Sequence, residues 1–371
     1  ENPDDRMALS AYTINVKGNV FLYSGKFEGV VMLGGSTIGS DLQCGSGKFI
    51  NPGGTAIFAP GATIGGVVYL TKERGQSDFE VNGLVNFSVD RIDNSVVIDG
   101  ARFLGARSEP HGLNLAGISV KRAFTWRDVT MQNGATLDLS GASVAWLVDE
   151  EKSWPAPGDL KLDGFQYSGF GLESPNDVQS RLRWLGLQPA GFHVQPYRQL
   201  AKIYSDNGDE VSALRILVAK DDARYVQYGV PGRLWGGFLK YTIGYGHRPF
   251  LAMVWSLAVV LFGWAMTAAG KRAGVMRPTW PENVPSSEPA KPYERLHPLL
   301  YSLDVFLPFV NLHQEHYWWT DSAAKGEVVI LNQRVPFSGA VLRSYFWMQI
   351  IAGWLLSAIF VAGITGLLRN D

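Results

Sequence analysis

Two long stretches of the sequence contain no charged residue, and they constrain the fold more than any other feature. Asp, Glu, Lys and Arg are all missing from 249–270 and again from 345–368. At about 1.5 Å per residue, a helix of either stretch is long enough to cross the roughly 30 Å hydrocarbon core of a bilayer. The alternative is a buried helix of a large soluble protein, but such helices rarely extend this far without a charged face. We therefore expect two transmembrane helices, at 249–270 and 345–368.

Basic and aromatic residues border both apolar stretches. Arg248 precedes the first stretch, Lys271 follows it, and Arg343 precedes the second. Such side chains anchor a span because their polar ends reach water while their stems stay in the apolar layer. The segment 231–246 mixes aromatic and basic residues and predicts a helix lying in the membrane interface, with a soluble helix as the alternative. The expected interfacial anchors are Trp235, Arg248, Trp318 and Trp319.

A short repeat fills the N-terminal part of the chain. The apolar residues Phe27, Ile38 and Phe49 recur at a constant interval, and apolar residues alternate within each unit, as at Val20 and Leu22. This alternation is typical of strands with one buried face. Units this short must stack on their neighbours, and two units per coil give about 22 residues per turn. We expect a right-handed β-helix, or β-solenoid, over 1–165, with a β-sandwich of short strands as the alternative.

A helical pattern follows the repeats, from 166 to 230. Asn176 or Asp177 is a suitable N-cap for a short helix. After Pro196, two amphipathic stretches joined at Asn207-Gly208 predict a helical hairpin that is similar to one tetratricopeptide repeat. Because only one such repeat is present, we interpret it as a connector rather than a peptide-binding groove.

The segment that joins the two spans contains a further apolar element, at 296–319. Its mostly apolar stretch from Leu299 to Leu312 is interrupted by Asp304 and Pro308. This stretch is too short to span a bilayer and suits a re-entrant or interfacial segment. Many tetrameric pores have a span, a re-entrant element and a second span, with the middle element lining the conduction path. A helix resting on the membrane surface is the alternative.

Polar residues in these segments are candidates for pore lining or gating. Asp304 is the only acidic residue between Leu296 and Gln314. An ionisable group at membrane depth is costly unless it faces water or a partner, so a ring of symmetry-related carboxylates would attract cations. The alternative is that Asp304 caps a surface helix or pairs with Arg295. The candidates are Asp304, Asn311 and Gln349.

Small residues form a stripe along the second expected span. Such stripes let helices approach closely. Two spans cannot enclose a pore unless several subunits assemble, so we expect a homo-oligomer, with a tetramer favoured by analogy. The expected helix-packing residues are Gly353, Ser357, Ala358, Ala362 and Gly366.

The sequence contains no motif of an enzyme. Cys44 is the only cysteine, which excludes an intramolecular disulfide and a thiolate zinc site. His313 and His316 lie beside tryptophans and fit an interfacial belt better than a metal site. Asp90, Asp93 and Asp99 resemble the acidic cluster of a β-helical polysaccharide lyase or hydrolase, yet Asp is also an ordinary residue of β-helix turns. The net charge of -1 gives no global attraction to nucleic acid. We expect no catalytic residue, metal or cofactor.

Nearly the whole chain resembles a group of uncharacterised bacterial two-span membrane proteins with an N-terminal β-solenoid. They share GxLxLxGAxI repeats, a WLxLQPxxFxxQPYRQLAxxYxxxGDxxxAxxxLxAK stretch, a GYGxRP motif before the first span, a YSLDxxLPFVxL loop and a final VAGITGLLR. Sequences of this group are sometimes labelled membrane-associated oxidoreductases, a chemistry that no residue here supports. The corresponding segments are 184–220, 244–249, 301–312 and 361–369.

The architecture also resembles that of membrane effectors in bacterial antiphage signalling, where a nucleotide signal controls a pore. This resemblance implies a nucleotide or oligonucleotide ligand, a partner protein at the β-solenoid and a place in the bacterial inner membrane. The Lys and Arg count near the spans does not decide the orientation, and we expect the solenoid in the cytoplasm because no signal peptide is visible. We expect an oligomeric channel or pore-forming effector controlled by the solenoid. The alternative is a membrane-anchored solenoid scaffold or interaction protein.

Overall fold

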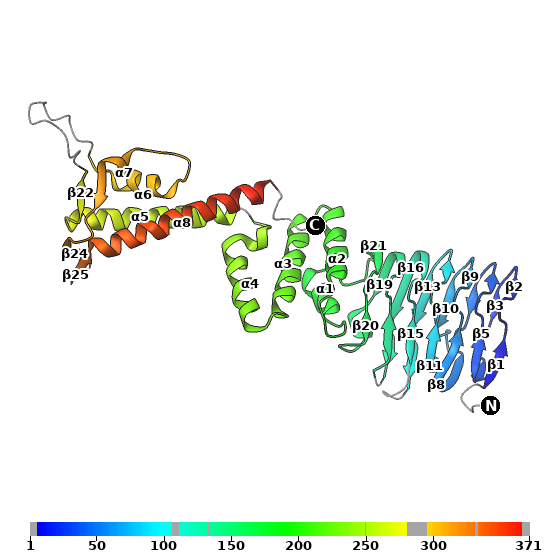
Figure 1. The fold of residues 1–371 in the computed structure, drawn as a ribbon. Helices are drawn as coiled ribbons and strands as arrows, with labels where there is room; N and C mark the ends of the chain where they lie inside the picture. The colour runs from blue at the N-terminus through cyan, green and yellow to red at the C-terminus, as the bar shows by residue number, and fades with distance from the viewer. Residues whose placement is uncertain are drawn as a thin grey trace, which may run out of the picture. The chain divides into compact units, whose positions relative to one another are not determined.

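The computed structural model describes residues 6–105, 111–132, 134–248, 250–279, 295–330 and 333–365 (Figure 1). The chain forms two compact units, Glu1–Gln227 and Tyr228–Asp371. Each is described by itself below.

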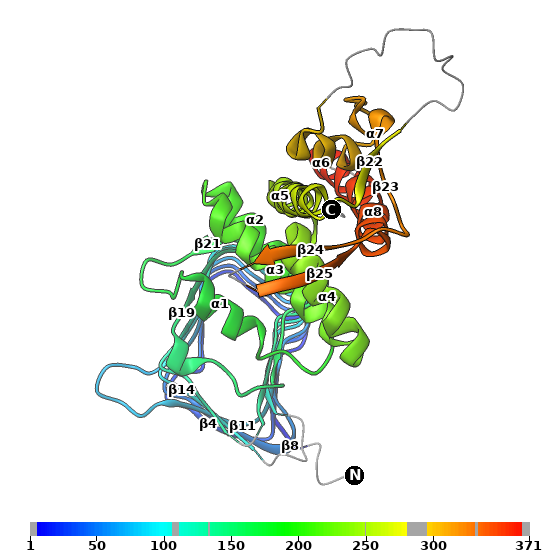
Figure 2. The ribbon, with the colours of Figure 1, turned by 90° about the vertical axis from the view of Figure 1, so that its left-hand side faces the viewer.

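The first unit is a β-solenoid of about six turns, as expected, and not a sandwich. Every strand pair within it is parallel and joins one coil to the next. Coil length varies along the solenoid. Asn15 pairs with Thr37 in the first coil, and a longer stretch of chain separates Thr63 from its partner Arg91 in a later coil. Seen along the coils in Figure 2, the strands overlie one another around one cross-section. The prediction of about 22 residues per turn therefore holds for the first coil, and later coils contain insertions.

The strands of the solenoid form two sheets. The ten-stranded sheet contains β1 (Met7–Ser10), β4 (Lys26–Glu28), β5 (Val30–Met32), β8 (Lys48–Phe58), β11 (Phe79–Asn86), β14 (Ala101–Leu104), β15 (Gly112–Asn114), β17 (Thr130–Met131), β18 (Thr136–Asp138) and β20 (Leu160–Lys161). The eleven-stranded sheet contains β2 (Asn15–Val16), β3 (Val20–Phe21), β6 (Thr37–Ile38), β7 (Leu42–Gln43), β9 (Thr63–Ile64), β10 (Val68–Thr71), β12 (Arg91–Ile92), β13 (Val96–Asp99), β16 (Ser119–Arg127), β19 (Ser143–Asp149) and β21 (Gln166–Phe170).

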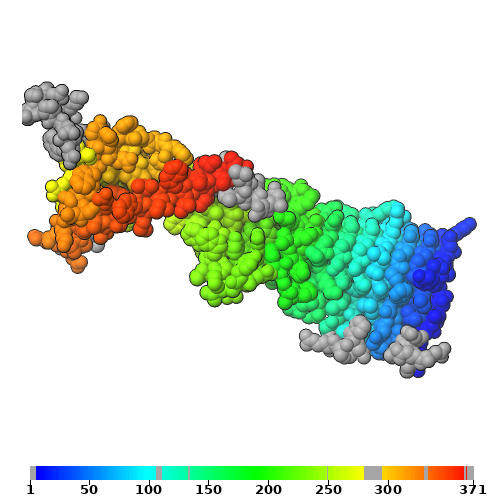
Figure 3. Space-filling view, in the orientation of Figure 1, coloured from blue at the N-terminus to red at the C-terminus, as the bar shows by residue number. Residues whose placement is uncertain are grey.

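Apolar side chains stack inside the coils in ladders. Ile38, Ile64 and Ile92 align in register on three successive coils, and all three are at most 1% exposed. The rings of Phe27 and Phe49 stack with centroids 4.9 Å apart. Because each coil contains two sequence repeats, the side chains of one ladder come from every second repeat. Burial of these ladders supplies the main stabilisation of the solenoid. Figure 3 shows the coils as continuous bands of packed atoms.

One corner of every coil adopts a left-handed backbone conformation. Most of its positions carry glycine, which tolerates a positive φ because it lacks a Cβ. The exceptions are Thr13, with φ of 56°, and Val89, with φ of 54°. The remaining positions are Gly35, Gly61, Gly117, Gly141 and Gly164. The left-handed backbone at this corner explains why glycine recurs there from coil to coil.

Three helices follow the last coil within the same unit. They are α1 (Val178–Leu185), α2 (Val194–Asp206) and α3 (Glu210–Val226), and a short 3₁₀ helix, η1 (Glu151–Ser153), precedes them. Asp177 caps α1 by accepting a hydrogen bond from the backbone of Ser180, and α2 ends at Asn207. The predicted cap and hairpin are confirmed. The last solenoid strand extends to Phe170, beyond the expected boundary at 165.

The second unit contains the two apolar helices, α5 (Phe250–Arg272) and α8 (Gly339–Ile364). Both are long and apolar enough to cross a membrane. In the most apolar stretch of each helix, only 22% of α5 and 17% of α8 is buried. Neither is mostly buried, as a core helix of a soluble protein would be. The other elements are α4 (Gly229–Ile243), η2 (Gly244–Gly246), β22 (Met276–Pro278), α6 (Pro298–Phe306), α7 (Gln314–Tyr317), β23 (Trp318–Thr320), β24 (Lys325–Ile330) and β25 (Gln333–Ser338).

Candidate functional site

The short helix α6 packs against both apolar helices, and polar side chains join the three. Gln349 of α8 donates hydrogen bonds to the carbonyl and hydroxyl oxygens of Ser302 in α6, at 2.8 and 2.9 Å. The Ser302 hydroxyl in turn donates to the carbonyl of Val260 in α5, at 2.8 Å. Gln349 and Ser302 are at most 1% exposed. This chain of hydrogen bonds fixes α6 between the two apolar helices.

Two glycines allow this close packing. A Cβ on Gly263 of α5 would lie 2.3 Å from the Ser302 hydroxyl, and one on Gly353 of α8 would lie 1.9 Å from the carbonyl oxygen of Phe306. Gly353 was predicted to pack helices, and its neighbour is α6 of the same chain. The space beside Gly353 is therefore already occupied by the same chain.

The carboxylate of Asp304 organises the chain after α6. One oxygen accepts a hydrogen bond from the backbone N–H of Leu312 at 2.6 Å, and the other from that of Glu315 at 2.9 Å. Asp304 is only 6% exposed. Both oxygens thus tie the returning chain to α6, and the two partners are backbone N–H groups rather than Arg295.

The other predicted pore and packing residues lie in different surroundings. Asn311 is exposed in the turn after α6, where its side-chain oxygen accepts from the N–H of His313 at 2.7 Å. Gln349 is buried as described above. On α8, Ala358 is exposed while Ser357 and Ala362 are half-buried, so these three remain accessible to another helix. Gly366 lies outside the described residues.

The predicted interfacial anchors occupy exposed or partly exposed positions. Trp235 on α4 is 56% exposed and its ring stacks on that of Phe238, at 5.4 Å between centroids. Trp319 is 45% exposed, and Trp318 and Arg248 are half-buried. The apolar face of α4 is therefore open, as an interfacial helix requires.

A buried ion pair closes the end of the solenoid. Arg181 of α1 donates two hydrogen bonds, each 2.8 Å, to the carboxylate of Asp149 at the end of β19. Its guanidinium also lies 3.8 Å from the ring centroid of Phe170. The side chain of Arg181 is 0% exposed and that of Asp149 is 3% exposed. The first helix is thus locked onto the last coil.

Two glutamines of α2 complete the capping of the last coil. Gln195 accepts from the N–H of Gly164 at 2.9 Å and donates to the carbonyl of Phe165 at 3.0 Å, and Gln199 donates to the carbonyl of Tyr167 at 2.6 Å. Their side chains take the place of a further strand, because they bond backbone N–H and C=O groups at the edge of the last coil. Sequence reasoning did not find this role. The only signal was the spacing of the two glutamines by about one helical turn, which places both on one face of a helix.

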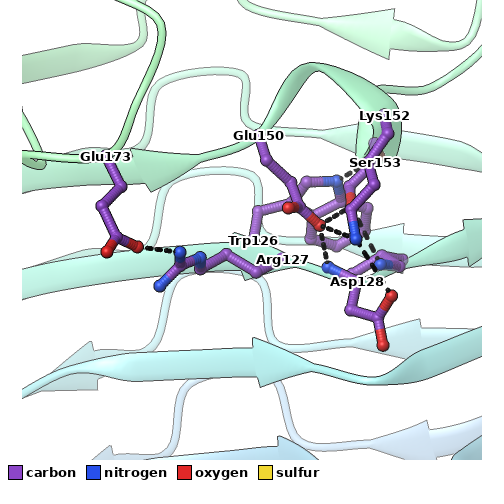
Figure 4. Close-up of polar contacts among 8 residues, drawn as sticks. Trp126, Arg127, Asp128, Glu150, Lys152, Ser153 and Glu173 are labelled. Carbon is purple, nitrogen blue, oxygen red and sulfur yellow. Dashed lines mark hydrogen bonds and ion pairs between the residues drawn. The ribbon is translucent and has the colours of Figure 1, made fainter.

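A cluster of charged residues lines one outer corner of the solenoid (Figure 4). Glu150 accepts hydrogen bonds from the backbone of Asp128 and from the Ser153 hydroxyl, and Lys152 lies 3.3 Å from the carboxylates of both Glu150 and Asp128. Trp126 donates to the Ser153 carbonyl at 2.6 Å. These groups bond one another and hold the corner in shape.

The three aspartates that resembled an acidic cluster do not share a site. Asp90 is 1% exposed inside the coil, where one oxygen accepts from the N–H of Ala62 at 2.8 Å. Burial raises the pKa of Asp90 to about 8. Asp93 instead lies on the surface, where Lys121 at 2.8 Å and then Arg91 lower its pKa. Burial is the main cause of the raised pKa of Asp99.

The surface of the solenoid has a groove with a volume of about 450 Å³. Small side chains such as Ser95 and Ala123 form part of its lining, with Arg122 and the 52% exposed Trp146 beside them. Within the described part of the chain, the guanidinium of Arg122 has no hydrogen-bond or ion-pair partner. A cationic group and an aromatic ring are thus both available to a ligand there.

Comparison with protein-family models, with curated proteins and with solved structures gives no match for this chain. Across the described residues, no group of three or more His, Cys, Asp or Glu side chains is arranged to hold a metal ion.

Proposed function

We propose that the chain is the subunit of an oligomeric membrane channel or pore-forming effector, in which α6 and the turn after it form a re-entrant element. The observation that carries this proposal is the set of contacts that α6 makes along both apolar helices. These contacts support a path that starts at one membrane surface, reaches the middle of the spans and returns.

The contacts of α6 with its neighbours support a deep position of α6 in the membrane. Lys271, near the end of α5, donates to the carbonyl of Leu296 at 2.9 Å, just before α6 begins. Ser302 contacts Val260, which lies about 18 Å along the helix from Arg272 at the rise of an α-helix. After α6, the chain returns to β23, which pairs with β22 shortly after α5. This supports a descent past the middle of a roughly 30 Å layer.

The turn after α6 supports the involvement of several subunits. Phe309, Val310 and Asn311 are exposed, and none of their N–H groups has a hydrogen-bond partner among the described residues. In hydrocarbon each unsatisfied group would cost several kcal/mol, so irregular backbone at this depth requires protein or water around it. Two spans cannot enclose water alone. Neighbouring subunits, with a tetramer favoured by analogy, would surround a water-filled path at this turn.

Control by the first unit is the second part of the proposal. The groove with Arg122 and Trp146 offers a cation for phosphate and an aromatic ring for a base. We therefore assign a nucleotide or oligonucleotide signal to this groove, as the resemblance to antiphage effectors implies. In this view the solenoid lies in the cytoplasm and the spans lie in the bacterial inner membrane.

Water access to the turn tests the pore. The buried Cys44 leaves the chain free of a reactive native thiol. The reconstituted Asn311→Cys variant should conduct ions. A charged methanethiosulfonate reagent should change its current within seconds, because water reaches the new thiol. Leu257→Cys, at an exposed apolar position of α5, is the matched control and should not respond.

Oligomer size and current together separate the channel from its alternative. Ala358→Leu on α8 should disperse the oligomer and abolish the current, while Leu355→Ala nearby should leave both in place. A monomeric wild type, or an oligomer that passes no ions with any nucleotide tested, would contradict the channel and favour the membrane-anchored scaffold.

A further inference from the structure

A cavity of about 310 Å³ lies beside the first turns of α8 in the second unit. Its walls come from α6, α7, β23 and α8, all within one unit. The polar part of the lining contains Glu315 and Arg343, and the aromatic part contains Trp318, Trp319 and Trp347. The cavity therefore combines both signs of charge with several indole rings.

The two charged side chains of the cavity do not neutralise each other. The carboxylate of Glu315 has no hydrogen-bond or ion-pair partner within the part of the chain that the structure describes. Arg343 donates to the Ser322 hydroxyl at 3.1 Å, and its guanidinium lies 5.7 Å from the ring centroid of Trp347. An anionic group and a cationic group are thus both available to the same ligand.

The cavity becomes more apolar along α8. Arg343 lies in the first turns of this helix, whereas Phe346 and Ile350 line the cavity one and two turns further on. If α8 spans the bilayer, Arg343 lies near the water boundary and Ile350 lies among acyl chains. Tryptophans such as Trp318 and Trp319 are enriched at this boundary.

We propose that this cavity binds the headgroup of a zwitterionic phospholipid of the phosphatidylethanolamine type. The phosphate accepts hydrogen bonds from Arg343, because guanidinium and phosphate geometries match. The ammonium group lies between the Glu315 carboxylate and the tryptophan rings, which attract a cation through their π faces. An anionic headgroup without an amine leaves Glu315 unpaired and is disfavoured.

This inference requires only that α5 and α8 lie in a membrane. It does not depend on the pore, because the cavity is complete within one chain. Binding can therefore fail while the conductance remains, and the conductance can fail while binding remains.

The experiment uses the full-length protein in detergent, with binding measured by calorimetry and native mass spectrometry. The probes are dihexanoyl phosphatidylethanolamine, dihexanoyl phosphatidylglycerol and glycerophosphoethanolamine. We expect the ethanolamine lipid to bind about tenfold more tightly than the glycerol lipid, which is the effect of one charge-assisted contact. Tighter binding of the glycerol lipid would overturn the proposal.

Two variants separate the roles of the charges. Glu315→Gln should remove the preference for ethanolamine while phosphate binding persists, and Arg343→Gln should weaken binding of both lipids about tenfold. The exposed pair Glu327→Gln and Arg334→Gln, on the hairpin of β24 and β25, gives matched controls that should bind as the wild type does. A preference that survives in Glu315→Gln would overturn the assignment of the ammonium site.

The glycerophosphoethanolamine arm identifies the source of the headgroup. It lacks acyl chains, so it should bind at least tenfold more weakly than the lipid if Phe346 and Ile350 contact those chains. Equal affinity would overturn a membrane lipid as the ligand and assign the cavity to a soluble phosphoethanolamine compound.

Discussion

The Arg181 guanidinium and the Asp149 carboxylate form two hydrogen bonds of 2.8 Å at a position closed to solvent. The pair joins α1 to the end of β19, so it connects the helical cap to the coil that it covers. Asp149 also accepts from the indole N–H of Trp154 at 2.8 Å, which holds the carboxylate in place.

Removal of one partner of this pair should destabilise the first unit strongly. Arg181→Met leaves a buried carboxylate without its cation and is expected to lower the free energy of unfolding by about 3–5 kcal/mol. Chemical denaturation of the full-length protein measures the change in the free energy of unfolding. Hydrogen exchange of the β19 and β21 amides shows whether the loss is at the capped end. Arg183→Met is the control, because the ion pair of Arg183 with Glu151 is about half exposed and is worth at most about 1 kcal/mol. Equal effects of the two changes would contradict the capping role.

Asp90 should make the solenoid less stable as the pH rises. Its pKa is raised from 3.8 to about 8 by burial, so the folded state holds a proton that the unfolded state releases. Stability from this group is full below pH 4 and is lost between pH 4 and pH 8. The free energy of unfolding of Asp90→Asn should therefore exceed that of the wild type by about 2–4 kcal/mol at pH 8 and by little at pH 4. Thermal unfolding across this range measures the difference.

Asp93 provides the opposite sign as a control for that experiment. Its pKa is lowered by Lys121 and Arg91, so its contribution is present above the unfolded pKa and is lost as the pH falls. Asp93→Asn should slightly lower the stability of the solenoid at pH 8 and leave it unchanged at acidic pH. A pH-independent effect of Asp90→Asn would show that the Asp90 carboxyl ionises normally.

Val89→Gly should stabilise the solenoid. Val89 is β-branched, has φ of 54° and is 67% exposed, so its left-handed backbone is strained and its side chain buries little. Relief of that strain exceeds the entropy that glycine adds to the unfolded chain, and we expect a net gain of about 1 kcal/mol. Thermal unfolding tests this gain. Val97→Gly, in strand β13 of the same coil, should instead cost about 1 kcal/mol.

Cys44 should resist alkylation until the solenoid unfolds. Burial raises the pKa of this thiol to about 12, compared with about 8.5 for an exposed cysteine, so almost no thiolate is present at pH 8. Maleimide labelling at pH 8 should be at least about a hundredfold slower for the wild type than for Ser119→Cys, which places a thiol on the exposed face of β16. Rapid labelling of the native wild type would indicate that the first coils open.

The sequence by itself determined the elements whose signal is local. Charge-free stretches predicted α5 and α8, because a helix facing lipid must be apolar all round. Alternation at Val20 and Leu22 and the regular spacing of Phe27 and Ile38 predicted the coils, because each rung repeats the same contacts. The pair Asn176 and Asp177 predicted the start of α1, because a cap needs only the next few residues, and the structure uses Asp177.

Tertiary structure alone decided which distant residues meet. Nothing near Asp304 in the sequence indicates that its two oxygens bind the backbone of Leu312 and Glu315, because that contact depends on how the chain turns after α6. The neighbour of Gly353 proved to be α6 of the same chain, because helices of one chain also compete for a small-residue face.

The cavity beside α8 shows the same limit. Glu315 and Arg343 lie far apart in the sequence and line one space only because β23 and α7 fold back against α8. Periodicity records the faces of single elements, whereas a binding site depends on the distances between elements, and long-range packing fixes those distances.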